Sequence, residues 1–200
     1  MTSKVLAIIP ARGGSKGLPG KNLRPFCGLP LIRNSFLCAL RILEVSDIVI
    51  SSEAEEILTA ACPDQNLWIQ RPTELAQDDV PVWAVIRHAL AERERTTGTA
   101  FEYVVLLEPT SPCRRPEWVS GALQLLKDHP HADGVHGISL TPFNPIWNCL
   151  VESDGYLQYL VPQGRFFFRR QDVPPTYRMD GSLHVWRARF VREQEAGYHW

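Results

Sequence analysis

The sequence has almost no net charge. Its 200 residues include 21 lysines and arginines against 22 aspartates and glutamates, which gives a formal charge of −1. General binding to nucleic acids or to acidic membranes needs a large positive excess. We therefore expect no nucleic-acid and no membrane partner, and any anion-binding site must be local.

Long apolar runs and paired cysteines are also missing. No stretch approaches the roughly 18 apolar residues of a membrane span, and the first residues lack the pattern of a signal peptide. The five cysteines are odd in number and contain no Cys-x-x-Cys pair, which argues against a disulfide framework and a zinc knuckle. These absences predict a soluble, cytoplasmic protein.

Apolar runs that alternate with helical periodicity are present throughout the chain. A hydrophobic content of 44% is ample for one domain over residues 1–200. The alternation predicts an α/β fold with a Rossmann-like, open, mostly parallel sheet, whose ligands lie at the carboxyl ends of the strands. Strands are expected at 5–9, 47–51, 67–69, 103–107, 134–140 and 182–186, and helices at 30–43, 53–61, 82–90, 116–126 and 188–196.

The rhythm changes over residues 141–178, where prolines, aromatics and a basic run predict a short, hairpin-like insertion. Arg169 and Arg170 follow three phenylalanines. Two neighbouring guanidinium groups beside apolar side chains can bind a carboxylate or a phosphate in a bidentate manner, but the same residue types are enriched in protein interfaces. Both interpretations stay open.

A glycine-rich turn follows the first expected strand, in the stretch I-I-P-A-R-G-G-S-K-G-L-P-G-K-N (8–22). Backbone N–H groups in such a turn can approach an anion closely, and Arg12, Lys16 and Lys21 add positive charge. The stretch is neither a Walker A loop nor G-x-G-x-x-G. We interpret it as a polyphosphate cradle, with a solvated basic turn as the alternative.

This stretch resembles the first signature motif of the acylneuraminate cytidylyltransferases, the CMP-sialic acid synthetase family. Later segments are similar to further motifs of that family, in the same order. They are I-S-S-E-A-E-E-I (50–57), R-P-T-E-L-A-Q-D (71–78), L-L-E-P-T-S-P-C-R (106–114), R-R-Q-D (169–172) and Y-R-M-D-G-S-L (177–183).

The resemblance implies a nucleotidyltransferase with a fold of the nucleotide-diphospho-sugar transferase type, a small dimerisation insertion at 141–178 and a homodimer. The implied reaction joins CMP from CTP to a 2-keto-3-deoxy sugar acid such as a sialic acid, releases pyrophosphate and uses Mg²⁺. The enzyme would mainly position its substrates and neutralise growing negative charge.

The resemblance also assigns residues to the site. Arg12 and Lys21 would hold the triphosphate, and Arg169 would meet the acceptor or the reacting phosphate; these three form the expected catalytic set. The expected nucleotide-binding residues are Ala11, Arg12, Gly13, Gly14, Ser15, Lys16, Lys21, Asn22 and Arg71. The expected acceptor-binding residues are Glu108, Arg169, Arg170, Tyr177, Arg178 and Asp180.

Four positions depart from the family pattern. Val80 and Val82 stand where relatives carry serines that help to read cytosine, and valine side chains form no hydrogen bonds. Glu108 and Asp180 replace a glutamine and an asparagine. Carboxylates there would repel an acidic acceptor, so we hypothesise either an amine-bearing acceptor or a metal ion that bridges these oxygens.

The Asp-x-Asp element that binds metal in the family lies beyond the final helix and is not found in this sequence, so the metal ligands stay unknown. Two alternatives therefore remain. The first keeps the fold and chemistry but uses a different nucleotide or a small phosphonate or amine-bearing acceptor. The second is a non-catalytic, nucleotide-binding homologue that serves as a partner subunit.

Overall fold

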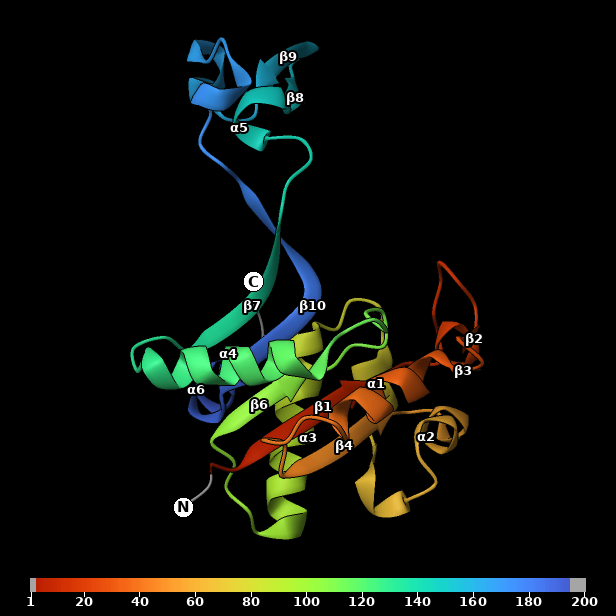
Figure 1. Ribbon diagram of the computed structural model, residues 1–200. Helices are drawn as coiled ribbons and strands as arrows, with labels where there is room; N and C mark the ends of the chain where they lie inside the picture. The colour runs from red at the N-terminus through yellow and green to blue at the C-terminus, as the bar shows by residue number, and fades with distance from the viewer. Residues whose placement is uncertain (1–2, 195–200) are drawn as a thin grey trace. The chain divides into compact units, whose positions relative to one another are not determined.

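The computed structural model describes residues 3–194 and is built on a six-stranded sheet (Figure 1). The strands are β1 (Val5–Pro10), β4 (Asp47–Ser52), β5 (Trp68–Gln70), β6 (Tyr103–Leu106), β7 (Gly134–Leu140) and β10 (Tyr177–Arg187). Their order is β5-β4-β1-β6-β10-β7. Strand β1 is parallel to β4 and β6, β4 is parallel to β5, and β10 is antiparallel to β6. The predicted mostly parallel, Rossmann-like α/β sheet is confirmed.

Helices cover both faces of the sheet. They are α1 (Leu31–Ala39), α2 (Glu55–Ala61), α3 (Val82–Thr97), α4 (Pro116–Asp128) and α6 (Ala188–Glu193). One core cluster joins α1, α2 and α4 to one face, and a second joins α3 and α6 to the other (Figure 1). Within β1, Ala7 belongs to the first cluster, whereas Leu6 and Ile8 belong to the second. Burial on both faces explains why this strand is a continuous apolar run.

A short segment after β1 brings Lys21 and Asn22 to the sheet. The 3-10 helix η1 (Lys21–Leu23) follows Gly20, whose φ of 63° is left-handed and favours glycine. A small hairpin of β2 (Pro25–Phe26) and β3 (Leu29–Pro30) then leads into α1. Two more 3-10 helices, η2 (Gln65–Leu67) and η3 (Thr73–Ala76), flank β5.

Several helix ends differ from the sequence expectation; helix α3, for example, continues to Thr97 instead of ending near residue 90. Helix α1 stops at Ala39, and Leu43, expected on its apolar face, is 97% exposed because it lies beyond the helix in the loop before β4. Helix α6 ends at Glu193. Gln194 is already extended, so the expected helix is too long there, and residues 195–196 of that expectation lie outside the described residues.

The chain divides into two compact units. Among the described residues, the first comprises 3–136 and 181–194 and the second comprises 137–180, so β7 and β10 each contribute to both. The second unit also holds α5 (Pro145–Asn148), β8 (Leu150–Ser153), β9 (Tyr156–Tyr159), η4 (Pro162–Phe166) and η5 (Arg170–Asp172). Strands β8 and β9 pair in a hairpin whose turn, Asp154-Gly155, has φ values of 54° and 78°. Two positive φ angles at Asp-Gly are typical of a tight hairpin turn.

Within residues 3–194, none of the helices combines the length and the apolar character that a membrane crossing requires.

Candidate functional site

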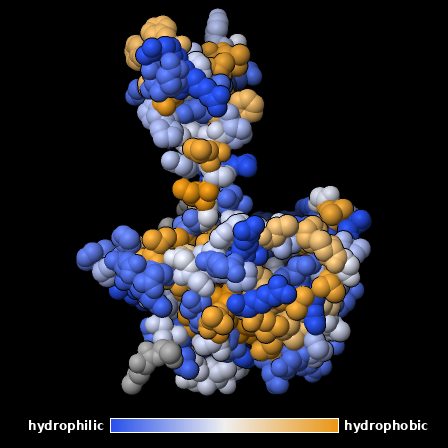
Figure 2. All heavy atoms as spheres, in the orientation of Figure 1, coloured by the Kyte–Doolittle hydropathy of each residue, from blue (hydrophilic) through white to orange (hydrophobic). Residues whose placement is uncertain are grey.

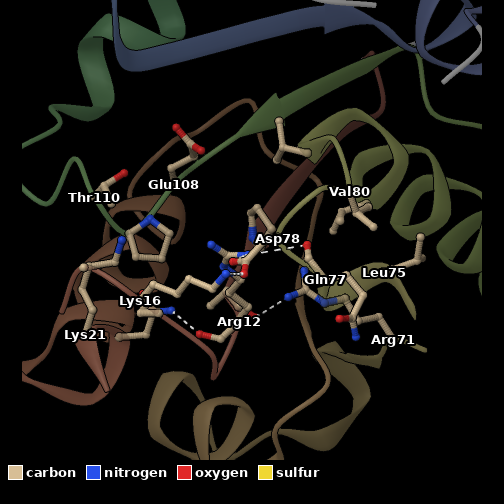
Figure 3. A pocket seen from close by; sticks show the side chains of 18 of the residues that line it. Arg12, Lys16, Lys21, Arg71, Leu75, Gln77, Asp78, Val80, Glu108 and Thr110 are labelled. Carbon is tan, nitrogen blue, oxygen red and sulfur yellow. Dashed lines mark hydrogen bonds and ion pairs between the residues drawn. The ribbon is translucent and has the colours of Figure 1, made fainter. Parts of the chain in front are cut away.

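A pocket of about 720 Å³ lies where the parallel strands of the first unit end (Figure 3). Arg12 follows β1, Arg71 follows β5 and Glu108 follows β6, and all three line the pocket. Ligands of open α/β sheets bind at this edge because the loops that leave the carboxyl ends of the strands meet there. The location therefore agrees with the sequence expectation.

Most of the expected nucleotide-binding residues come together in this pocket. Those that line it are Ala11, Arg12, Ser15, Lys16, Lys21, Asn22 and Arg71. Gly13 and Gly14 are not part of the lining. The backbone N–H of Gly13 donates to Oε1 of Glu53 at 2.6 Å, so this amide is already bonded within the protein rather than left for an anion. The binding roles themselves stay predictions.

Two cations of the cradle converge on one carboxylate. Nη1 of Arg12 lies 2.7 Å from Oδ1 of Asp78, and Nζ of Lys16 forms an ion pair with Oδ2 (Figure 3). The hydrogen bond from Lys16 is the main reason that the pKa of Asp78 is lowered from its usual value. Two side chains from the glycine-rich turn can thus share a single anionic group.

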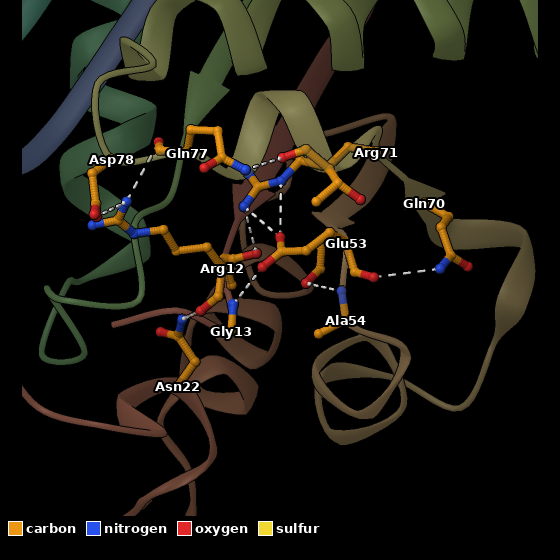
Figure 4. Close-up of polar contacts among 12 residues, drawn as sticks. Arg12, Gly13, Asn22, Glu53, Ala54, Gln70, Arg71, Gln77 and Asp78 are labelled. Carbon is orange, nitrogen blue, oxygen red and sulfur yellow. Dashed lines mark hydrogen bonds and ion pairs between the residues drawn. The ribbon is translucent and has the colours of Figure 1, made fainter. Parts of the chain in front are cut away.

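Arg71 is held by a network rather than projecting freely into the pocket (Figure 4). Its Nε and Nη2 donate to Oε2 of Glu53 at 3.2 and 2.8 Å, and Nη2 also donates to the carbonyl oxygen of Ala11 at 3.1 Å. Asn22 acts on the same segment, because its Nδ2 donates to the carbonyl oxygen of Arg12 at 2.9 Å. Both side chains are buried and hold the backbone at the end of β1.

Glu108 brings a second carboxylate to the pocket. Burial raises its pKa, while the positive charges of Arg114 and Lys21 act in the opposite direction. Arg114 is itself buried, and its Nη2 donates to the carbonyl oxygen of Glu108 at 3.2 Å. Its Nε donates to the carbonyl oxygen of Ser182 and so ties the loop after β6 to β10. The carboxyl group therefore stands on a fixed backbone.

The other expected acceptor residues belong to the second unit, where two of them form hydrogen bonds with residues of that unit. They are Arg169, Arg170, Tyr177, Arg178 and Asp180. Nε and Nη2 of Arg169 bind the two carboxylate oxygens of Asp172 at 2.8 and 3.0 Å. Nε of Arg178 donates to Oγ of Ser139 at 3.1 Å. Their roles toward an acceptor, including the catalytic role of Arg169, stay predictions.

The described residues do not form a ready metal site. Within 3–194, no group of three or more His, Cys, Asp or Glu side chains is placed to hold a metal ion. The carboxylates that line the pocket are Glu108 and Asp78, and Asp78 already binds Arg12 and Lys16. As they stand, these side chains do not fit the Mg²⁺ ion that the family resemblance implies.

The pocket also contains residues that the sequence did not point to as ligands. Four apolar residues from one stretch of the chain also line it, and we call them the apolar wall: Leu75, Val80, Val82 and Val85. Only Val80 and Val82 were expected near a base. Gln77 and Asp78 end the motif R-P-T-E-L-A-Q-D (71–78), but the sequence did not predict their contacts with Arg12 and Lys16, because these depend on how the loop after η3 folds back over the turn after β1. Glu53 had a signal, since it directly follows a buried strand.

Comparisons with known proteins point to one enzyme family. The sequence profile of the cytidylyltransferase family matches residues 6–189. A CMP-N,N'-diacetyllegionaminic acid synthase from Legionella pneumophila is 31% identical over 98% of this chain and 83% of the relative. An N-acylneuraminate cytidylyltransferase from Streptococcus agalactiae is 28% identical over 91% of this chain and 43% of the relative.

A solved structure gives an independent comparison of the fold. It is titled CMP:2-keto-3-deoxy-manno-octonic acid synthetase complexed with CTP. It superimposes with a TM-score of 0.68 at 20% identity and covers 95% of this chain and 76% of that chain. At this identity the match speaks for the fold alone.

Proposed function

This chain belongs to the cytidylyltransferase family of nucleotidyltransferases, and from that premise we propose that it transfers CMP from CTP to a sialic-acid-like 2-keto-3-deoxy sugar acid. The observation that carries the proposal is the pocket at the carboxyl ends of the parallel strands. Arg12, Lys16 and Lys21 line it from a single glycine-rich turn and its short helix. Three cations beside one cavity suit a triphosphate.

The proposed reaction requires the protein chiefly to position the two substrates and to neutralise negative charge. A hydroxyl oxygen of the acceptor attacks the α-phosphorus of CTP, the new P–O bond forms as the bond to pyrophosphate breaks, and the hydroxyl proton leaves to a base or to solvent. Arg12 and Lys21 would neutralise the charge that grows on the leaving pyrophosphate. The base and ribose would lie toward Arg71 and the apolar wall.

Recognition of cytosine would rest on groups other than the valines. Val80 and Val82 line the pocket but cannot donate or accept hydrogen bonds. Backbone groups and the side-chain amide of Gln77, which also lines the pocket, are the candidates for this recognition. Thermal-shift titration with CTP, UTP, ATP and GTP reports the preferred base, because a ligand that binds only the folded state raises its stability.

The acceptor would be one that tolerates a carboxyl group at Glu108. We propose that it bears an amine, because the other hypothesis, a metal ion, has no set of His, Cys, Asp or Glu ligands among the described side chains. Replacing Glu108 with Gln and Asp180 with Asn should then shift the preference toward acceptors without an amine. Unchanged selectivity in both variants would discard this part of the proposal.

Mg²⁺ dependence is a separate proposal, which rests on the family resemblance. A divalent ion would screen the triphosphate and stabilise the pyrophosphate. Asp78 and Glu108, as they lie in the pocket, do not form a ligand set for this ion. Assays with Mg²⁺ and with a chelator decide the point: activity that survives chelation would refute the requirement.

The decisive experiment measures pyrophosphate release from CTP in the presence of a panel of 2-keto-3-deoxy sugar acids. Release that depends on both CTP and an acceptor is the expected result. Release with another nucleotide, or only with a phosphonate or an amine-bearing acceptor that is not a 2-keto-3-deoxy sugar acid, would favour the enzymatic alternative. Nucleotide binding without any release would favour a non-catalytic partner subunit.

We also propose a cytoplasmic homodimer that forms through the second unit. Among residues 137–180, all of which the structure describes, only Gly164 and Val173 are buried. Units of about 40 residues rarely form a sufficient core alone and commonly associate with another chain. Hydrophobic side chains lie at the surface of this unit among hydrophilic ones (Figure 2), including Phe143, Tyr156, Leu157 and Phe168.

A further inference from the structure

Glu53 occupies a central place among the loops that form the pocket. It directly follows β4, and its side chain is 17% exposed. One carboxylate oxygen accepts the N–H of Gly13 at 2.6 Å, and the other accepts Nη2 of Arg71 at 2.8 Å (Figure 4). A single side chain thus links the loops that follow three neighbouring parallel strands, β1, β4 and β5.

The partner guanidinium extends this link. The side chain of Arg71 is 4% exposed, and it also donates to the carbonyl oxygen of Ala11 at 3.1 Å. The backbone N–H of Arg71 donates to the carbonyl oxygen of Ser52, and that of Ala11 donates to Ser51. The segment that carries Arg12 is therefore fixed from two sides. A buried guanidinium needs such a partner, because an uncompensated buried charge is strongly destabilising.

We propose that Glu53 is a positioning residue that holds the turn after β1 and the guanidinium of Arg71 in the geometry that receives the nucleotide. The inference rests on the proposed function, because it assumes that a nucleotide occupies this pocket. Glu53 acts through Gly13 and Arg71 and has no contact with the reacting atoms in this account.

In this arrangement the cations of the pocket have two different roles, structural support and phosphate binding. The carboxylate of Glu53 compensates the charge of Arg71, so Arg71 supports the pocket wall. Lys21 would meet the phosphates directly, and Arg12 and Lys16 would join it once a phosphate replaces the carboxylate of Asp78. Without Glu53 the nucleotide would have to order the turn as it binds, and this ordering would weaken its affinity.

The test compares two matched variants. Glu53→Gln removes the charge at one end of β4, and Asp47→Asn removes a charge at the other end. Asp47 is a good control because Nε and Nη2 of Arg93 bind its two oxygens at 2.7 Å each, and its side chain is 18% exposed. Asp47 does not line the pocket. Both variants leave an arginine without its carboxylate.

The expected result separates stability from binding. Both variants should lower the midpoint of thermal unfolding, but only Glu53→Gln should weaken CTP binding in calorimetry, by about tenfold. Its KM for CTP should rise more than its kcat falls. Amide hydrogen exchange of residues 11–17 in the nucleotide-free protein should become faster in Glu53→Gln and stay unchanged in Asp47→Asn.

A second variant guards against misfolding of the first. Glu53→Asp keeps a negative charge beside Arg71, but its shorter side chain cannot reach both Gly13 and Arg71. It should fold and bind CTP more weakly than the wild type. If neither Glu53 variant differs from Asp47→Asn in CTP affinity and in exchange of the turn, the inference is wrong.

Failure of the proposed function would look different. In that case the wild-type protein itself would release no pyrophosphate with any acceptor. The hydrogen-exchange comparison of the two variants would still decide whether Glu53 orders the turn.

Discussion

At the scale of single residues, Glu108 links burial to a measurable pH dependence. Its pKa is raised from 4.5, chiefly by burial. The folded state therefore binds this proton more tightly than the unfolded chain does. The stability from the protonated carboxyl is present below the ordinary pKa and is lost as the pH rises through the raised pKa.

Replacing Glu108 with Gln should remove this loss. The thermal midpoint of Glu108→Gln should exceed that of the wild type near pH 8, and the difference should shrink toward pH 4. Glu102→Gln is the control, because Glu102 is exposed just before the other end of β6. A difference that does not change between about pH 4 and about pH 8 would contradict the raised pKa.

At the scale of elements, the loop between η3 and α3 controls access to the cations. Asp78 in this loop binds Arg12 and Lys16, so a triphosphate must replace its carboxylate to reach both. Because its pKa is lowered, Asp78 stays charged at pH values below its usual titration range. Its competition with the triphosphate for Arg12 and Lys16 should therefore persist at mildly acidic pH.

Asp78→Asn should therefore strengthen CTP binding by about two- to fivefold in the absence of a divalent ion. The control is Asp79→Asn, which removes the same charge from the neighbouring exposed residue. Calorimetric titration of both variants measures the effect. Weaker binding by Asp78→Asn would mean that this carboxylate supports the nucleotide site instead of competing for it.

The elements also show why the sequence predicts some features and not others. Strands β1, β4 and β6 were expected to within one residue, because a strand buried on both faces must be a continuous apolar run. The cations of the turn after β1 were expected because their charge and spacing are local. The bond from Gly13 to Glu53 spans 40 residues of sequence and exists only because β1 and β4 are neighbours.

The exposed Leu43 has a related cause. In sequence, Leu43 lies at a helical spacing that continues the apolar face of α1. The helix ends at Ala39, however, so the spacing no longer predicts that Leu43 is buried. Sequence periodicity describes a face only as far as the helix extends.

At the scale of the whole molecule, the second unit should hold two chains together. We expect sedimentation to give the mass of a dimer for the wild type and of a monomer for Leu157→Ser combined with Phe168→Ser. Both residues are exposed, at 70% and 88%, and their burial between chains would supply the apolar contact. The control is Leu43→Ser, a residue of the first unit that is 97% exposed. A monomeric wild type would contradict the dimer.

The central claim is that the turn after β1 binds the triphosphate of a nucleotide. A calorimetric titration with CTP tests it most directly. The wild type should bind CTP at one site per chain, and Lys21→Gln should bind it about tenfold more weakly, because a charge-assisted hydrogen bond is lost. Lys127→Gln, at the end of α4, should match the wild type. Equal affinity of the wild type and Lys21→Gln would contradict the account.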